Sequence, residues 1–228
     1  MKTVDRDGQG VYKGMIHYLY CILLGYLVGT FNPSYLLALV HGVDIRKQGS
    51  GNAGASNALI LFGKLRGVIC ALLDIGKTVL VIKLTARLFP SLTYSFAVTA
   101  VSCILGHIFP FYMKFRGGKG LACLGGAILA YNWRLFTVML VAELLLALLT
   151  NYICFVPITA SIAFPLIYRH LEQDMIGTLI FFIATTVILC KHNENIVRIK
   201  EGKEMRLSYL WDREKETERL KENYSNKD

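Results

Sequence analysis

Residues 106–120 read GHIFPFYMKFRGGKG and lie between two long apolar runs. The stretch combines His107, Lys114, Arg116 and Lys119 with several glycines. Glycines let backbone N–H groups approach an anion closely, and Lys and Arg side chains supply the countercharge. A cationic, glycine-rich loop at the edge of apolar segments indicates a protein that handles a phosphate-bearing molecule at a membrane surface.

The composition of the chain favours a membrane-integrated fold. Of its 228 residues, 54% are hydrophobic and 18% are charged, and the apolar residues occur in long runs. This is too apolar for an ordinary soluble domain of that size. The formal net charge of +9 fits cytoplasmic loops that face anionic lipid. Since no basic and aromatic run indicates a DNA or RNA surface, no nucleic-acid partner is expected.

The six cysteines are scattered, mostly through apolar segments, and no pair has the spacing of metal ligands. They are therefore predicted to be free thiols, and no metal site is expected. A cleavable signal peptide is not expected either, because the first apolar run, residues 16–40, is too long for one.

The apolar segments predict an all-α, polytopic integral membrane protein with about seven transmembrane helices joined by glycine-rich cytoplasmic loops. A helix that crosses a bilayer needs ~20 mostly apolar residues, and fewer when it packs inside a bundle. The segments cover residues 16–40, 68–89, 94–112, 121–131, 135–149, 153–168 and 175–190. The fourth segment is short and follows a glycine, so a half-helix or re-entrant piece is an alternative there, with six spans in all.

The distribution of basic residues predicts an external N-terminus and a cytoplasmic C-terminus. In that orientation the cytoplasmic basic residues are Arg46, Lys47, Lys64, Arg66, Lys114, Arg116 and Lys119, followed by Lys191, Arg198, Lys200, Lys203 and Arg206. Residues 1–206 are expected to form one membrane domain. Residues 207–228 are expected to form a charged cytoplasmic tail, a solvated helix that frays into disorder.

A first motif, DIRKQGSGNAGASN at residues 44–57, is predicted to lie between the first two spans. Small polar side chains and bare amides form a nest for phosphate oxygens, and Arg46 adds positive charge. The candidate phosphate contacts are Ser50, Gly51, Asn52, Gly54 and Asn57. A flexible loop with ordinary turn chemistry is the alternative, although such a loop does not need this density of Gly, Ser and Asn.

The stretch at residues 106–120 forms a second motif, in which Gly117, Gly118 and Lys119 are the candidate phosphate contacts. Lys119 is followed by Gly120 rather than by Ser or Thr, which argues against a nucleotide P-loop. His107 is a candidate proton carrier or hydrogen-bond donor to an anion, although a lone His at a helix end is more commonly a hydrogen-bonded structural residue.

Two further groups of polar residues complete the candidates. Asp74 and Lys77 lie on one helical face of an apolar span, where a structural ion pair is favoured over a direct substrate role. The third motif, KHNENIVRIKEGKE at residues 191–204, places His192 and Asn195 directly after the last span, on the same predicted side as the glycine loops.

A covalent nucleophile is not apparent in the sequence. There is no G-x-S-x-G motif and no H-x-x-x-x-D box. Transfer of an acyl group can proceed without one when the leaving group is activated, as it is in an acyl phosphate. Positioning and charge stabilisation then suffice.

In these motifs the chain resembles the bacterial acyl-phosphate:glycerol-3-phosphate acyltransferase family. The resemblance runs from about residue 25 to residue 202 and rests on GSGNAGASN, GHIFPF with FRGGKG, KHNENI and the LLDIGK stretch. It implies an active site on the cytoplasmic face of the cell inner (plasma) membrane. It also implies transfer of a fatty acyl group from acyl phosphate to the sn-1 hydroxyl of glycerol 3-phosphate, which gives lysophosphatidic acid and phosphate without a cofactor. The partners implied are these two substrates and membrane lipid.

The resemblance also implies roles for particular residues. Ser50, Gly51 and Asn52 would hold phosphate, Lys119 would neutralise it, and His192 and Asn195 would complete the pocket. Arg46, Asp74, Lys77 and His107 would support the site.

The chain departs from the family pattern at several positions where the resemblance implies phosphate contacts. Ile60 stands where the family often has Arg, Cys154 where it commonly has Ser, and Lys191 where it has Arg. These changes remove or weaken charge-assisted contacts. They leave open the alternative that the chain is a divergent paralogue, either non-catalytic or re-purposed. A transporter or binding protein for a phosphorylated solute is a third hypothesis, although no internal inverted symmetry supports it.

Overall fold

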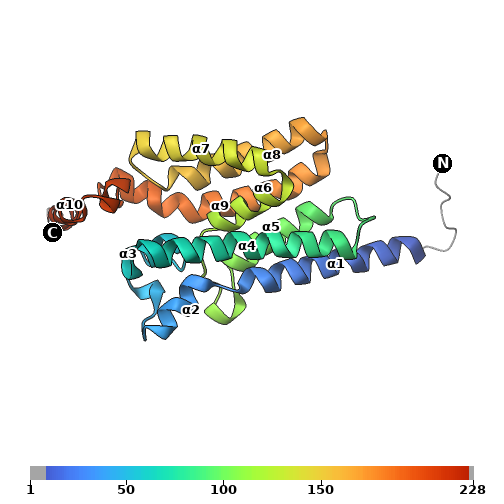
Figure 1. The fold of residues 1–228 in the computed structure, drawn as a ribbon, viewed down its shortest axis with the longest axis horizontal. Coiled ribbons are helices and arrows are strands. Elements are labelled where there is room, and N and C mark those ends of the chain that lie inside the picture. The colour runs from blue at the N-terminus through green and yellow to red at the C-terminus, as the bar shows by residue number, and fades with distance from the viewer. Residues whose placement is uncertain (1–8, 226–228) are drawn as a thin grey trace.

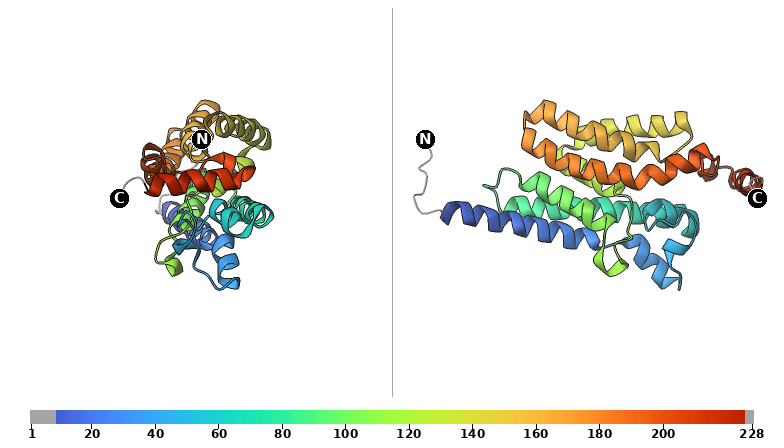
Figure 2. Two further views of the ribbon diagram at one scale, coloured as in Figure 1. Left: turned by 90° about the vertical axis from the view of Figure 1, so that its left-hand side faces the viewer. Right: turned by 180° about the vertical axis from the view of Figure 1, so that it is seen from behind.

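The computed structural model describes residues 9–225. Within this range the chain is helical and contains no β-strand. The α-helices are α1 (Gln9–Thr30), α2 (Pro33–Val40), α3 (Ala55–Phe62), α4 (Lys64–Leu88), α5 (Ser95–Ile108), α6 (Leu121–Tyr131), α7 (Trp133–Thr150), α8 (Phe155–Glu172), α9 (Met175–Lys200) and α10 (Arg213–Ser225). Three short 3₁₀ helices are η1 (Ile45–Lys47), η2 (Phe111–Met113) and η3 (Leu207–Leu210). The long helices run roughly along one axis, with the start of α1 at one end and α10 at the other (Figures 1 and 2).

The chain is an all-α integral membrane protein. Among the described helices, 4 segments are long and apolar enough to cross a bilayer: Gly14–Val40, Ser95–Met113, Trp133–Thr150 and Met175–Lys200. Exposed apolar side chains cover much of their outer surface. In α7, for example, only 11% of the residues are buried. Such a surface is costly in water and favourable in contact with lipid.

The first apolar run was predicted as one helix over residues 16–40, and the structure divides it. α1 ends at Thr30, and α2 begins at Pro33. Pro33 has no N–H to continue the helical ladder, and the Asn32 side chain accepts a hydrogen bond from the Tyr35 N–H as an N-cap. The local sequence FNP therefore contains the reason for the break.

The carbonyl groups that the break leaves unpaired in α1 are bonded by side chains from other helices. The Lys77 ammonium donates to the Gly29 carbonyl at 3.0 Å and to the Phe31 carbonyl, and the Tyr112 hydroxyl donates to the Thr30 carbonyl at 2.7 Å. An unsatisfied carbonyl at membrane depth costs several kcal/mol, so these contacts make an interrupted helix tolerable there.

Two other elements differ in length from the expected spans. α6 has 11 residues, so at ~1.5 Å per residue it is about half the ~30 Å thickness of a hydrocarbon core, as its short apolar run suggested. α9 continues from Met175 to Lys200, ten residues beyond the predicted end at residue 190. Residues 191–200 of the third motif therefore lie on α9, and residues 201–204 form the turn that follows it.

Glycines bring α1 and α5 into close contact. A Cβ atom on Gly29 would lie 2.2 Å from the Cys103 carbonyl oxygen, and one on Gly106 would lie 2.2 Å from the Tyr26 carbonyl oxygen. Only glycine permits this approach, which is the small-residue packing common between membrane helices. The largest apolar core lies alongside, around Phe164, Phe181 and the buried face of α5.

The C-terminal segment is helical, as predicted, but α10 is not a freely solvated helix. Glu216 is only 3% exposed, and the Leu207 N–H donates to the Asn151 carbonyl at 2.7 Å. The segment after residue 206 therefore packs against the turn that precedes it and against the loop between α7 and α8. Residues 226–228, where fraying was predicted, lie outside the described residues.

Candidate functional site

The loop of the first motif is ordered by one buried asparagine. Asn57 is fully buried; its amide oxygen accepts from the Ser50 N–H at 2.9 Å, and its amide nitrogen donates to the Ile45 and Gln48 carbonyls at 3.0 and 2.9 Å. All of its hydrogen-bonding atoms are thus used within the loop. Asn57 was predicted to contact phosphate; in the structure its side-chain amide orders the loop, and the phosphate contact stays a prediction.

Other residues of this loop remain accessible. Ser50 and Gly51 are exposed and Asn52 is half-buried, whereas Gly54 is buried as the N-cap residue of α3. The break between α1 and α2 holds the loop in place, because the Asn32 amide nitrogen donates to the Ala53 carbonyl at 2.8 Å. Asn32 is fully buried.

Arg46 connects the first motif to the second. Its guanidinium bonds both carboxylate oxygens of Asp44 at 2.9 Å and donates to the Met113 carbonyl at 2.7 Å. The hydrogen bond from Arg46 lowers the pKa of the Asp44 carboxyl to about 2, so the pair stays charged at physiological pH. Arg46 therefore supports the site, and its charge is already paired.

The two adjacent glycines of the second motif pack against His107. The Gly118 N–H donates to the His107 carbonyl at 3.1 Å, and the Gly117 N–H donates to the Ile108 carbonyl at 3.0 Å. A Cβ atom on Gly118 would lie 2.0 Å from His107 Nε2. Both N–H groups are thus bonded to the end of α5, and glycine is needed there for close packing. The contact of Gly117 and Gly118 with phosphate, expected from the sequence, stays a prediction.

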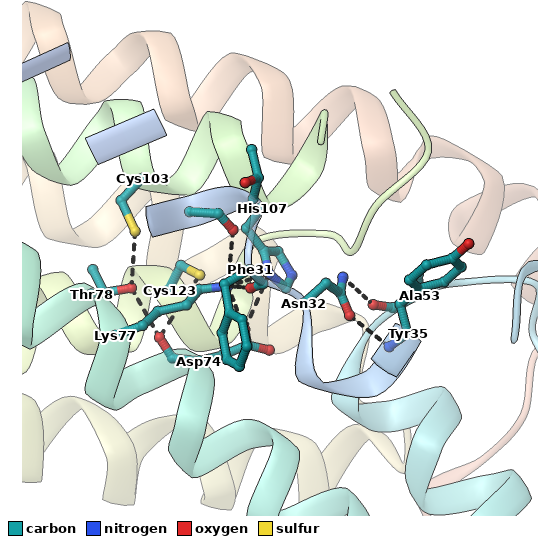
Figure 3. Close-up of polar contacts among 12 residues, drawn as sticks. Phe31, Asn32, Tyr35, Ala53, Asp74, Lys77, Thr78, Cys103, His107 and Cys123 are labelled. Carbon is teal, nitrogen blue, oxygen red and sulfur yellow. Dashed lines mark hydrogen bonds and ion pairs between the residues drawn. The ribbon is translucent and has the colours of Figure 1, made fainter. Parts of the chain in front are cut away.

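His107 belongs to a buried polar cluster with Asp74 and Lys77 (Figure 3). The Lys77 ammonium lies 2.6 Å from Asp74 Oδ1, and His107 Nδ1 lies 3.3 Å from the same oxygen and 3.2 Å from the ammonium. Exposure is 1% for Asp74, 7% for Lys77 and 2% for His107. The cluster joins α4 to α5 and to the end of α1, which supports the structural ion pair favoured from the sequence.

Asp74, His107 and Cys123 also place three potential ligand atoms within 4.8 Å of one another. The ammonium of Lys77 already contacts Asp74 Oδ1 at 2.6 Å. A positive charge in that position repels a metal cation and takes up the carboxylate oxygen that would bind it. This cluster is therefore better described as an ion pair than as a metal site.

Lys119 and the third motif meet directly. The Lys119 ammonium donates to the Asn195 amide oxygen, and the Asn195 amide nitrogen donates to Glu204 Oε1 at 2.7 Å. Arg198 Nε donates to the other carboxylate oxygen of Glu204 at 2.7 Å. Burial lowers the pKa of the Lys119 ammonium, and the nearby Arg198 charge adds to this effect. The negative charge of an anion bound at Lys119 would offset both the cost of burying the ammonium and its repulsion from Arg198.

His192 lies one turn before Asn195 on the same helix and is 4% exposed. Its Nδ1 lies 2.8 Å from the Ile188 carbonyl. A carbonyl can only accept a hydrogen bond, so Nδ1 carries the proton, and the Nε2 of the neutral ring is an acceptor. His192 can thus receive a hydrogen bond from a hydroxyl group.

The second motif is the element that contacts both of the others. It meets the first motif through Arg46 and Met113, and the third through Lys119 and Asn195. Lys191 adds a cation–π contact, with its ammonium 4.8 Å from the ring centroid of Phe109.

Sequence reasoning missed Asn32, Arg198 and Glu204 as parts of the site. Asn32 could have been found as the N-cap before Pro33, since Asn followed by Pro commonly begins a helix. Arg198 and Glu204 looked like ordinary charged tail residues, and only the length of α9 and the turn after it bring them to Asn195.

The positions that depart from the family pattern have different surroundings. Cys154 is 6% exposed and precedes α8, and Ile60 is half-buried on α3. Arg66, a basic residue that follows α3 in the sequence, is exposed, and its guanidinium donates to the Phe62 carbonyl at 3.3 Å. The Arg66 guanidinium therefore bonds to the last residue of α3, at the turn between α3 and α4.

The fold and the site together define an all-α integral membrane protein with a lysine-centred polar site built from glycine loops and the end of one long helix. A family model described as "Glycerol-3-phosphate acyltransferase" matches residues 19–202. The chain belongs to the glycerol-3-phosphate acyltransferase family.

Individual relatives agree with this assignment. Glycerol-3-phosphate acyltransferase 2 of Thermotoga maritima is 35% identical over 187 residues, which cover 82% of this chain and 94% of the relative. A glycerol-3-phosphate acyltransferase of Legionella pneumophila is 34% identical over 200 residues, covering 86% of this chain and 70% of the relative.

Solved structures also resemble the fold. The crystal structure of PlsY, an integral membrane glycerol 3-phosphate acyltransferase, in its glycerol 3-phosphate form has a TM-score of 0.78 and 28% identity, and covers 85% of this chain and 96% of that chain. The lysophosphatidic acid form of PlsY has a TM-score of 0.73 at the same 28% identity.

Proposed function

We propose that the protein transfers a fatty acyl group from acyl phosphate to the sn-1 hydroxyl of glycerol 3-phosphate in phospholipid synthesis. The contact between Lys119 and Asn195 carries this proposal, because it brings a half-buried cation of the second motif to the third motif on α9. Membership of the family and the likeness to PlsY in its glycerol 3-phosphate form support the acceptor. The acyl-phosphate donor is what the resemblance to the family implies, and the lack of an apparent nucleophile motif in the sequence agrees with it.

The transfer is a direct displacement at the acyl carbon. The hydroxyl oxygen of glycerol 3-phosphate forms the new ester bond, and the bond between the acyl carbon and the phosphate oxygen breaks. Phosphate leaves with the electron pair, and the hydroxyl proton passes to His192 Nε2 or to the departing phosphate. Lys119 neutralises phosphate charge, while Ser50, Gly51 and Asn52 contact phosphate oxygens from the accessible part of the first loop.

The site faces the cytoplasm of a cell inner membrane, with the N-terminus outside. Seven segments cross or enter the bilayer in this arrangement: α1 and α2 together as the first, then α4, α5, α6, α7, α8 and α9. The opposite positions of α1 and α10 along the long axis (Figure 1) and the basic loops near α10 support an odd number of crossings. Residues 207–228 then belong to the cytoplasmic side.

A reconstituted assay tests the function. Purified protein in detergent or lipid receives acyl phosphate and glycerol 3-phosphate, and the release of phosphate is compared with the formation of lysophosphatidic acid. We expect both products in equal amounts. Folded protein that forms neither would disprove the acyltransferase proposal and favour a non-catalytic paralogue, and uptake of glycerol 3-phosphate into vesicles would identify a transporter.

Substitution of Ile60 tests the effect of the missing arginine. If position 60 faces the substrate phosphate, Ile60→Arg adds a charge-assisted contact and should lower the KM for glycerol 3-phosphate by about 3–10-fold. The measurement is steady-state kinetics at varied glycerol 3-phosphate, with Ile60→Met as the uncharged control. An equal KM in both variants would show that the departure at position 60 does not weaken substrate binding.

A further inference from the structure

Side chains of the C-terminal helix α10 form hydrogen bonds to the turn that follows α9. Arg219 donates to the Gly202 carbonyl at 2.6 Å through Nη1 and to the Glu204 carbonyl at 2.8 Å through Nη2. The Asn223 side chain adds a second donor to the Gly202 carbonyl at 2.9 Å. One face of α10 thus binds the backbone of residues 202–204.

A buried carboxylate fixes Arg219 in this position. Glu216 is 3% exposed, and its oxygens bond Arg219 Nε at 2.9 Å and Nη2 at 2.5 Å. The same carboxylate accepts from the Arg206 N–H at 2.8 Å. Glu216 and Arg219 therefore close both ends of the 202–206 turn, and a carboxylate–guanidinium pair held by several bonds is strongly oriented.

The turn in question presents Glu204 to the site. Its backbone N–H donates to the Arg198 carbonyl at 3.0 Å, and its carboxylate accepts from Asn195 and Arg198. A carboxylate accepts but does not donate, so Asn195 must turn its amide nitrogen toward Glu204 and its oxygen toward Lys119. The orientation of the amide that contacts Lys119 is therefore set by Glu204, the last residue of the third motif, which lies in the turn after α9.

The residues that hold Glu204 lie beyond the part of the chain that defines the family. The family model ends at residue 202, whereas the contacts of Glu216 and Arg219 come from α10. These contacts are not needed to explain the membrane domain, which packs around α5, α6, α8 and α9.

We propose that α10 is a positioning clamp for the phosphate site, in which Arg219 and Glu216 hold the 202–206 turn so that Glu204 orients Asn195 toward Lys119. This inference rests on the proposed function for the identity of the ligand. Arg219, Glu216 and Glu204 do not contact the reacting atoms in this proposal. They act through Asn195 and Lys119.

The experiment uses full-length protein in detergent and four variants: Arg219→Ala, Arg219→Lys, Glu204→Gln and, as the matched control, Glu214→Gln at an exposed position of α10. The Kd for glycerol 3-phosphate is measured by calorimetry, and amide hydrogen exchange is followed over residues 195–206. Thermal unfolding shows that each variant is folded. Turnover with acyl phosphate is measured separately for KM and kcat.

We expect Arg219→Ala and Glu204→Gln to raise the Kd and KM for glycerol 3-phosphate by about tenfold, with a smaller effect on kcat. Arg219→Ala should also speed exchange at residues 202–206 by about tenfold or more, because the turn loses its clamp. Arg219→Lys should recover part of the affinity, and Glu214→Gln should match the wild type.

Unchanged Kd and unchanged exchange in Arg219→Ala would overturn the clamp. So would a variant that loses only thermal stability and kcat, since that is the result of a purely structural helix. A wild-type protein that binds glycerol 3-phosphate without acyl transfer would instead overturn the proposed function, and the Kd and exchange comparisons would still decide the clamp.

Discussion

Replacing Lys119 with Met should reduce kcat/KM for acyl transfer by about 10²–10³-fold. Met keeps the packed alkyl chain but removes the charge that we assign to the substrate phosphate, and removing one preorganised electrostatic contact in a buried site typically has an effect of this size. The Lys119 ammonium is half-buried and contacts only the neutral amide of Asn195 among the hydrogen-bond acceptors described. It therefore remains available to an anion.

The control for Lys119 is Lys114, a lysine of the same loop whose side chain is exposed. Lys114→Met should change kcat/KM less than about threefold, because surface charges are screened by water and salt. Steady-state kinetics and the Kd for glycerol 3-phosphate measure both variants. Equal losses at the two positions would show that the loop attracts phosphate by general charge rather than through Lys119.

Breaking the Asp74–Lys77 pair should have the largest effect on stability. Asp74→Asn leaves the Lys77 ammonium buried without its counter-ion, and loss of one partner from a buried pair typically costs about 3–5 kcal/mol of unfolding free energy. Unfolding of the purified protein in detergent, followed by circular dichroism, measures the change. Lys77→Met removes the other partner of the pair. Lys83→Met is its control, because Lys83 is an exposed lysine on the same helix.

The double variant Asp74→Asn, Lys77→Met separates ion pairing from helix capping. It removes both charges, so it should be more stable than the sum of the two single losses predicts. It should still be less stable than the wild type, because the Gly29 and Phe31 carbonyls lose the Lys77 donor. Full additivity of the two single effects would show that the charges of Asp74 and Lys77 do not stabilise each other.

The sequence predicted much of the membrane fold because helices in lipid must satisfy their own backbone groups. Long apolar runs therefore give helices whose existence, although not their ends, follows from composition. The end of α9 was placed ten residues too early, since polar side chains were taken to end the span. The division of α1 from α2 was missed although Asn32 and Pro33 encode it, because apolar content alone cannot detect a break in a helix.

The candidate site was predicted as a set of residue types and only partly as an arrangement. Lys119 and Asn195 were both named from sequence, and the structure brings them together. Gly117, Gly118 and Asn57 were also named, but their polar groups bond within the protein. A glycine that offers its amide to a ligand and a glycine that packs beneath a histidine look alike in sequence, because both positions exclude a Cβ atom.

By itself, the sequence determined that this chain is a helical membrane protein and which short motifs carry its polar chemistry, because apolar length and residue type are local properties. Only the tertiary structure decided which of those groups remain available. Hydrogen bonds of the folded loops use the N–H groups of Gly117 and Gly118 and the side-chain amide of Asn57, and a bond between distant segments uses the Arg46 guanidinium. The Lys119 ammonium is left beside Asn195 of α9. The packing of α10 through Glu216 and Arg219 was also decided by the tertiary structure. A charged side chain such as that of Glu216 is buried only where an opposite charge and backbone groups bond to it.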